Sequence, residues 1–211
     1  MFHQVSSILI LALLLGCGKV HLGVVLDSSS PSQGTGKQQA TQLMDLAKQV
    51  SHLFPVSLEG NSVGMVVYGG SPQPSVVHFD RFLDQKSMDQ AIDNASNPSF
   101  EIKIGKALTL AQEHLFSPIP TSKHNVLLLV TDGSSTDDVS RPAIELKRRG
   151  IEVFCLGVGR DVNKTQLDVI ASKPAKDHVF LAPFNDADTL MEKIQKGICQ
   201  SANRSGELFN E

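Results

Sequence analysis

The chain has 211 residues, a formal net charge of -3 and a hydrophobic fraction of 41%. This length suits one domain with a sizeable buried core and a short processed segment. No long run of Lys or Arg is present, which argues against nucleic-acid binding through a basic face. The densest basic cluster, residues 147–149, is interpreted as favourable charge at the end of a helix.

The first 18 residues have the pattern of a secretory signal peptide. Their apolar run covers residues 5–15, which is too short to span a bilayer, and small residues follow at Gly16 and Gly18. We expect residues 1–18 to be a signal peptide, with cleavage at residue 16 as an alternative, and the mature protein to be secreted. The letters "LLLGC" also resemble a bacterial lipobox that would lipidate Cys17. No later apolar stretch predicts a membrane anchor.

Apolar, β-rich runs alternate with helical patterns along the rest of the chain. We predict strands at residues 20–27, 62–70, 75–80, 124–133, 151–159 and 178–182. We predict helices at residues 37–50, 86–94, 105–116, 137–149, 163–172 and 186–199. This alternation predicts a single α/β domain over residues 19–200, a Rossmann-like, doubly wound and mostly parallel sheet with helices on both faces. The hairpin of the second and third strands supplies one antiparallel edge strand, and residues 201–211 are predicted to form a polar, disordered tail.

Two acidic residues stand at the carboxyl ends of predicted buried strands, where they should lie close together. Asp27 ends the first predicted strand and Asp132 ends the central one. Ligand sites in such sheets form at the carboxyl ends of the strands, so both acids should lie on the same rim. A phosphate-binding loop ending at Gly36-Lys37 is the competing interpretation. It is disfavoured because its first glycine position is Pro31, and Gln38 replaces the hydroxyl residue that would hold Mg²⁺.

The blocks "VVLDSSS", "VGMVVYGG", "LLLVTDGSSTDD" and "GIEVFCLGVG" resemble, in this order, the von Willebrand factor type A domain. Integrin I domains and the globular modules of collagen VI and matrilins belong to the same family. The resemblance runs from about Val20 to Cys199. It implies a metal-ion-dependent adhesion site, at which a ligand carboxylate completes the coordination of Mg²⁺ or Mn²⁺.

The resemblance assigns only part of the family's ligand set. Asp27 and Ser29 match the first two positions of the Asp-x-Ser-x-Ser loop, and Asp132 matches a later aspartate. The third loop position falls on Pro31, which has no ligating side chain, and a local shift would be needed to bring Ser32 into its place.

The family's threonine ligand aligns with Ile102, whose side chain cannot bind a metal. The site is therefore predicted to be degenerate, and any binding of Mg²⁺ or Mn²⁺ to be weak. Without a cation the two carboxylates would repel one another, which favours a raised pKa on one of them. The other interpretation is that Asp27 and Asp132 cap loops through hydrogen bonds to backbone N–H groups. Asp137 and Asp138 are expected to begin the helix that follows them.

Cysteines and glycosylation motifs agree with a secretory route. Cys155 lies in an apolar strand pattern and is interpreted as a buried thiol. If cleavage leaves Cys17 on the mature chain, an oxidising compartment favours a disulfide with Cys199; cleavage after Gly18 would leave Cys199 alone. Candidate N-glycosylation sites stand at Asn94, Asn163 and Asn203.

These observations predict a secreted, non-catalytic module that binds another extracellular protein, with collagen or another matrix protein as the ligand class that the resemblance implies. The alternative is a structural matrix component that acts through self-assembly. An enzyme is not expected because the rim lacks a recognisable nucleophile. The single histidines show no zinc-ligand spacing.

Overall fold

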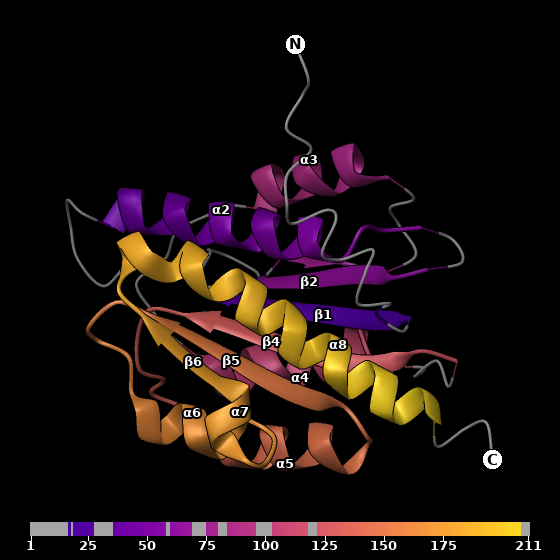
Figure 1. The fold of residues 1–211 in the computed structure, drawn as a ribbon. Coiled ribbons are helices and arrows are strands. Elements are labelled where there is room, and N and C mark those ends of the chain that lie inside the picture. Colours follow the sequence, from indigo (N-terminus) through magenta and orange to yellow (C-terminus); the bar gives the residue numbers. More distant parts are fainter. Residues whose placement is uncertain are drawn as a thin grey trace.

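The computed structural model describes residues 17, 19–27, 36–57, 60–68, 75–79, 84–95, 103–117 and 122–207 (Figure 1). Its centre is a six-stranded sheet in the order β3-β2-β1-β4-β5-β6. All neighbouring strands are parallel except β2 and β3. The strands are β1 (Val20–Asp27), β2 (Ser62–Tyr68), β3 (Ser75–Val77), β4 (His124–Thr131), β5 (Glu152–Val158) and β6 (Val179–Ala182). The predicted fold class, including its antiparallel edge strand, is confirmed.

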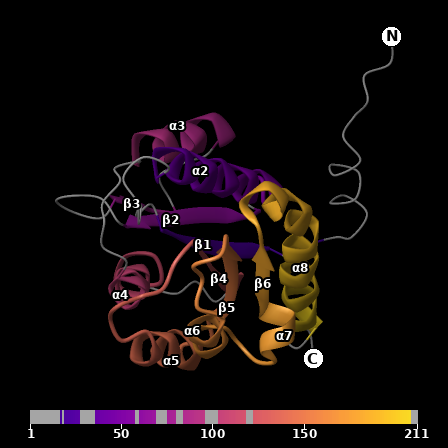
Figure 2. The ribbon, with the colours of Figure 1, turned by 90° about the vertical axis from the view of Figure 1, so that its left-hand side faces the viewer.

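Helices cover both faces of this sheet (Figure 2). The first face packs against α2 (Gly36–Leu53), α3 (Gln85–Ala95) and α8 (Met191–Glu207). The second face packs against α4 (Ile104–His114), α5 (Ser140–Arg148) and α6 (Lys164–Ile170). The remaining helical segments are α7 (Ala175–His178) and the 3₁₀ helix η1 (Phe184–Leu190).

Strand β1 carries few polar residues because both of its faces are buried. Val24 and Leu26 point into the core beneath α2 and α8, whereas Val25 between them points into the core beneath α4. All eight residues of the strand are buried. A strand covered on both faces needs apolar side chains at successive positions, which explains the unbroken runs in β1 and β4.

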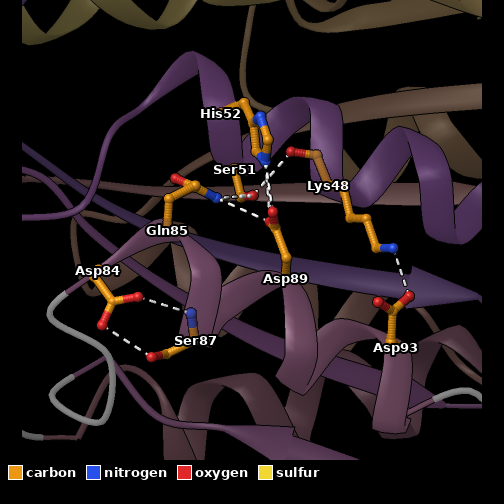
Figure 3. Close-up of polar contacts among 8 residues, drawn as sticks. All are labelled: Lys48, Ser51, His52, Asp84, Gln85, Ser87, Asp89 and Asp93. Carbon is orange, nitrogen blue, oxygen red and sulfur yellow. Dashed lines mark hydrogen bonds and ion pairs between the residues drawn. The ribbon is translucent and has the colours of Figure 1, made fainter.

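A polar seam joins α3 to α2 at the surface (Figure 3). His52 Nε2 lies 2.9 and 3.0 Å from the two carboxylate oxygens of Asp89, and Lys48 Nζ lies 2.5 Å from Asp93 Oδ1. Gln85 donates from Nε2 to Ser51 Oγ at 2.8 Å. These contacts supplement the buried apolar side of α3, which presents Met88 and Ile92 to the core.

The last helix differs from the sequence prediction at both ends. Residues 184–190 form a 3₁₀ helix, and α8 then continues to Glu207, past the domain end expected at residue 200. The prediction of a disordered tail is therefore wrong for residues 201–207. Ser201 and Ala202 are buried, at 7% and 4% exposure, so this polar-looking stretch still packs against the domain.

A disulfide joins Cys17, just before β1, to Cys199 in α8, with 4.7 Å between their Cα atoms. The bridge that the sequence left open is thus present in the structure. Cys155 is free and buried, as expected. In the part of the chain that the structure describes, no helix has the length and apolar character needed to cross a membrane.

Candidate functional site

The two predicted acids lie at the carboxyl edge of the sheet. Strands β1 and β4 are adjacent and parallel, with Leu26 opposite Val130, so Asp27 ends its strand beside Thr131 and Asp132 follows directly. Thr131 donates a hydrogen bond from Oγ1 to Asp27 Oδ2 at 2.8 Å. Its hydroxyl oxygen also accepts from the N–H of Gly133 at 3.3 Å. Thr131 thereby ties the end of β1 to the loop that leaves β4.

Asp132 is the exceptional group at this rim. The residue is only 3% exposed. Among the described residues, neither of its carboxylate oxygens has a hydrogen-bond partner. Burial raises its pKa to about 7, and the nearby charges of Asp27 and Asp161 add to this effect. A buried carboxylate without a partner is costly, so this position favours either protonation or a bound cation.

Tyr68 lies at the end of β2, opposite Asp27 in the strand register. Burial raises the pKa of its hydroxyl well above the ordinary value, and the charge of Asp27 raises it further. Tyr68 therefore remains a neutral hydroxyl beside the acids.

Asp27 and Asp132 fit the chemistry of a divalent cation, because carboxylate oxygens are hard ligands and the two oxygens of Asp132 have no hydrogen-bond partner among the described residues. The predicted ligands Ser29 and Ser32, together with Pro31 and Ile102, lie outside the described residues. Their contribution remains a prediction. Within the described residues, no group of three or more His, Cys, Asp or Glu side chains could hold a metal ion.

The loop after Asp132 is fixed by Asp137, in a role that the sequence did not suggest. Its carboxylate accepts from the N–H of Gly105 at 2.9 Å and from that of Lys106 at 2.8 Å, and so caps α4 rather than α5. The N-cap position of α4, Lys103, provides no side-chain cap of its own. The expectation that Asp137 begins the following helix is wrong, whereas Asp138 does accept from Ser140 N at the start of α5.

Ser135 and Gln166 hold the same loop from two further directions. Ser135 Oγ accepts from the N–H of Ile104 at 3.0 Å and donates to Asp137. The side-chain amide of Gln166, on α6, bonds both the N–H and the carbonyl oxygen of Ser135 at 2.9 Å. The loop that carries Asp132 is thus anchored to α4 and α6.

The candidate glycosylation sites fall on helices or their caps. Asn94 and Asn203 are exposed on α3 and α8. Asn163 is the N-cap of α6, and its Oδ1 accepts from the N–H of Gln166 at 3.2 Å. Their modification remains a prediction.

A family model described as the von Willebrand factor type A domain matches residues 21–196. Vitrin from Homo sapiens is 30% identical over 195 residues, which cover 90% of this chain and 28% of vitrin. The collagen alpha-6(VI) chain from Homo sapiens is 29% identical over 192 residues, which cover 89% of this chain and 8% of that protein. The chain therefore spans less than a third of the length of either relative.

A solved structure shows the same fold. Proximal thread matrix protein 1 from the mussel byssus, with a zinc-occupied MIDAS (metal-ion-dependent adhesion site) motif, matches with a TM-score of 0.76 at 22% identity. The match covers 87% of this chain and 46% of that one.

Proposed function

The chain belongs to the von Willebrand factor type A family, and on this premise we propose that it is a secreted, non-catalytic module that binds another extracellular protein, collagen or a further matrix protein, through the rim at Asp27 and Asp132. The observation that carries the proposal is the buried carboxylate of Asp132, whose oxygens have no partner among the described residues. Such a group is poised for a cation. The collagen alpha-6(VI) chain and matrilin-2 among the relatives support a setting in the extracellular matrix, and a matrix protein such as collagen is the partner we propose.

The residues at the rim have separable tasks in this proposal. Thr131 orients Asp27 and leaves the oxygens of Asp132 available. A bound Mg²⁺ or Mn²⁺ would supply positive charge that attracts an acidic side chain of the partner protein. Ser29 and Ser32 would add hydroxyl oxygens. With Ile102 and Pro31 at two of the family's ligand positions, we expect the affinity for the cation to be low.

The disulfide supports secretion, because disulfides persist in oxidising compartments. It also bears on processing. Cys17 must remain on the mature chain for the bridge to exist, so we infer cleavage at residue 16 in place of the expected residue 18.

Calorimetric titration of the purified mature domain with Mg²⁺ and Mn²⁺ tests the cation site. We expect saturable heat at roughly millimolar cation or below in the unmodified protein. The heat should vanish in Asp132→Asn and persist in Asp177→Asn, which removes an exposed carboxylate on α7. Absence of heat in all three proteins would mean that the rim acids are structural.

A binding assay on immobilised collagen, with and without EDTA, tests the protein ligand. Binding that is lost with EDTA and in Asp132→Asn supports the proposal. Binding unaffected by either change would place the ligand on another surface.

Light scattering over increasing protein concentration tests the alternative function. Growth of defined assemblies without collagen binding would favour a self-assembling matrix component.

A further inference from the structure

A second, partly buried polar cluster lies at the opposite, amino-terminal edge of the sheet. Glu152, the first residue of β5, lies 2.7 Å from Nε2 of His124 in β4 and 2.7 Å from Nε2 of His178 at the end of α7. The hydroxyl of Ser201, in α8, also donates to its carboxylate. We call Glu152, His124, His178 and Ser201 the Glu152 clasp. It joins four elements that are far apart in sequence.

The geometry fixes the protonation state of His178. Its Nε2 faces the carboxylate of Glu152, and its Nδ1 lies 2.9 Å from the carbonyl oxygen of Pro174. Both partners can only accept, so both ring nitrogens must carry hydrogen and the ring is an imidazolium. His178 is 5% exposed, which makes it a buried cation with the charge of Glu152 beside it.

The electrostatics agree with this assignment. Burial opposes the charged form of His178, but the hydrogen bonds with Glu152 and Pro174 outweigh it and raise the pKa, assisted by the charge of Asp177. Burial likewise opposes the charged form of Glu152, and the hydrogen bonds from His124, His178 and Ser201 lower its pKa overall. The titratable groups around His178 are thus Glu152 from β5, His124 from β4 and Asp177 from α7 itself.

We propose that the Glu152 clasp is a pH-sensitive latch, which holds the last turns of α8 on the sheet while His178 is protonated and releases them when His178 is neutral. A neutral ring would place a lone pair against either the Pro174 carbonyl or the Glu152 carboxylate. That contact would become repulsive, and Glu152 would lose its buried cationic donor. The carboxylate of Glu152 would then keep only His124 and the hydroxyl of Ser201 as partners within the clasp and could turn away from the sheet, which loosens the bond by which the clasp holds α8.

The disulfide sets the limit of the released segment. Cys199 is bonded to Cys17, and Ser201 follows only two residues later. The covalent bond therefore retains α8 up to residue 199 at any pH. The latch controls residues 200–207. Among the side chains that the structure describes in this segment, those of Ser201 and Ala202 are buried, and that of Ala202 is small.

The direction of the pH effect follows from the two titrations. A raised pKa on His178 gives stabilisation that is complete below the unfolded value of 6.5 and is lost as pH rises through the folded value. A lowered pKa on Glu152 gives stabilisation that is complete above the unfolded value of 4.5 and is lost only in stronger acid. The latch is therefore tightest between about pH 4.5 and 6.5 and opens as pH rises through the folded pKa of His178.

Amide hydrogen exchange, corrected for the intrinsic pH dependence of exchange, tests the latch between pH 6 and pH 8.5. We expect protection in residues 200–207 to fall by up to about tenfold for each pH unit between the unfolded pKa of 6.5 and the folded pKa of His178, and to level off above the folded pKa, while β4 and β5 stay protected. In His178→Gln, protection should be low at both pH values. His52→Gln is the matched control, because it removes a histidine–aspartate pair at the surface and should behave as the unmodified protein (Figure 3).

No residue of the Glu152 clasp lies at the rim of Asp27 and Asp132. The hydrogen-exchange measurements at pH 6 and pH 8.5 are therefore repeated in Asp132→Asn, in which the acid at the rim cannot titrate. Nitrogen-15 NMR of the histidine ring gives the titration of His178 directly and needs no variant. A pKa of His178 at or below 6.5 would overturn the proposal. So would protection of residues 200–207 that is equal at both pH values in the unmodified protein.

Discussion

Asp27 and Asp132 are the same type of residue at the ends of neighbouring strands, yet their surroundings differ. Asp27 accepts a hydrogen bond from Thr131, whereas both oxygens of Asp132 lack a partner among the described residues. The raised pKa of about 7 at Asp132 means that folding favours its protonated form. Its ionised form therefore destabilises the fold in the absence of a cation.

This asymmetry predicts a pH-dependent stability. The folded pKa of Asp132 lies above the ordinary aspartate value of 3.8, so without a cation the free energy of unfolding should fall as pH rises from about 4 to about 7. Asp132→Asn should remove most of this fall and be more stable at pH 8, by roughly 2–4 kcal/mol, since each pKa unit corresponds to about 1.4 kcal/mol. Urea unfolding in EDTA over this pH range measures the effect. An unchanged pH profile in the variant would contradict the assignment.

The sequence could predict the two acids but not their supporting contacts. Asp27 and Asp132 each follow an apolar run, and parallel topology alone brings such strand ends together. Thr131 bonds Asp27 across 104 residues of sequence, and the Glu152 clasp is likewise formed from distant segments. Such pairings depend on strand register and side-chain direction, which no local pattern encodes. Isolated histidines gave no spacing from which to predict His124 and His178 on one carboxylate.

At the scale of elements, the start of α4 depends on a residue from another loop. Asp137 accepts from two N–H groups in the first turn of α4 and from the hydroxyl of Ser135. The proximity of Asp137 to α5 in sequence predicted a cap for the wrong helix. The chain folds so that the loop between β4 and α5 passes the beginning of α4.

We predict that Asp137→Ala lowers the free energy of unfolding by about 1–2 kcal/mol, because the first turn of α4 loses its cap. Asp138→Ala removes one hydrogen bond at an exposed position and should cost less. Chemical denaturation of both variants provides the comparison. A loss in Asp138→Ala equal to or larger than that in Asp137→Ala would contradict the assigned role.

Element boundaries were predicted less accurately than element types. Helix α8 was expected to end at Cys199, because the polar sequence beyond it shows no apolar face. The structure continues the helix through Ser201, whose hydroxyl bonds Glu152, and Ala202, which packs in the core. The hydroxyl of Ser201, which has a partly buried acceptor, and the small side chain of Ala202 were sufficient to extend the helix, although two such residues do not form a recognisable apolar face.

For the molecule as a whole, the sequence predicted the fold class because the two faces of the sheet impose their pattern directly. Unbroken apolar strands, intervening helices and one short hairpin leave few alternatives to a doubly wound sheet. The disulfide could not be decided from sequence, since it depended on whether processing retains Cys17. Its presence closes a loop with a sequence separation of 182.

The disulfide should stabilise the entire domain. Closing a loop of this length reduces the entropy of the unfolded chain, and we predict that the double variant Cys17→Ser/Cys199→Ser loses about 2–5 kcal/mol of unfolding free energy. Urea denaturation of the oxidised protein and of the double variant measures the loss. Intact mass with and without reductant checks that the mature protein contains Cys17 in a bond. An equal denaturation midpoint, or a mature chain without Cys17, would contradict the prediction.

The bridge between Cys17 and Cys199 also determines how the module would respond to mechanical load. Tension applied to the chain at these two residues would pass through one covalent bond and leave the intervening strands and helices unloaded. The distance between the two attachment points would stay near the 4.7 Å that separates their Cα atoms. If the bond were absent, the segment between the two cysteines, with its sequence separation of 182, could be pulled out to about 600 Å when fully extended. The oxidised module is therefore an inextensible link, whereas the reduced one could unravel under tension.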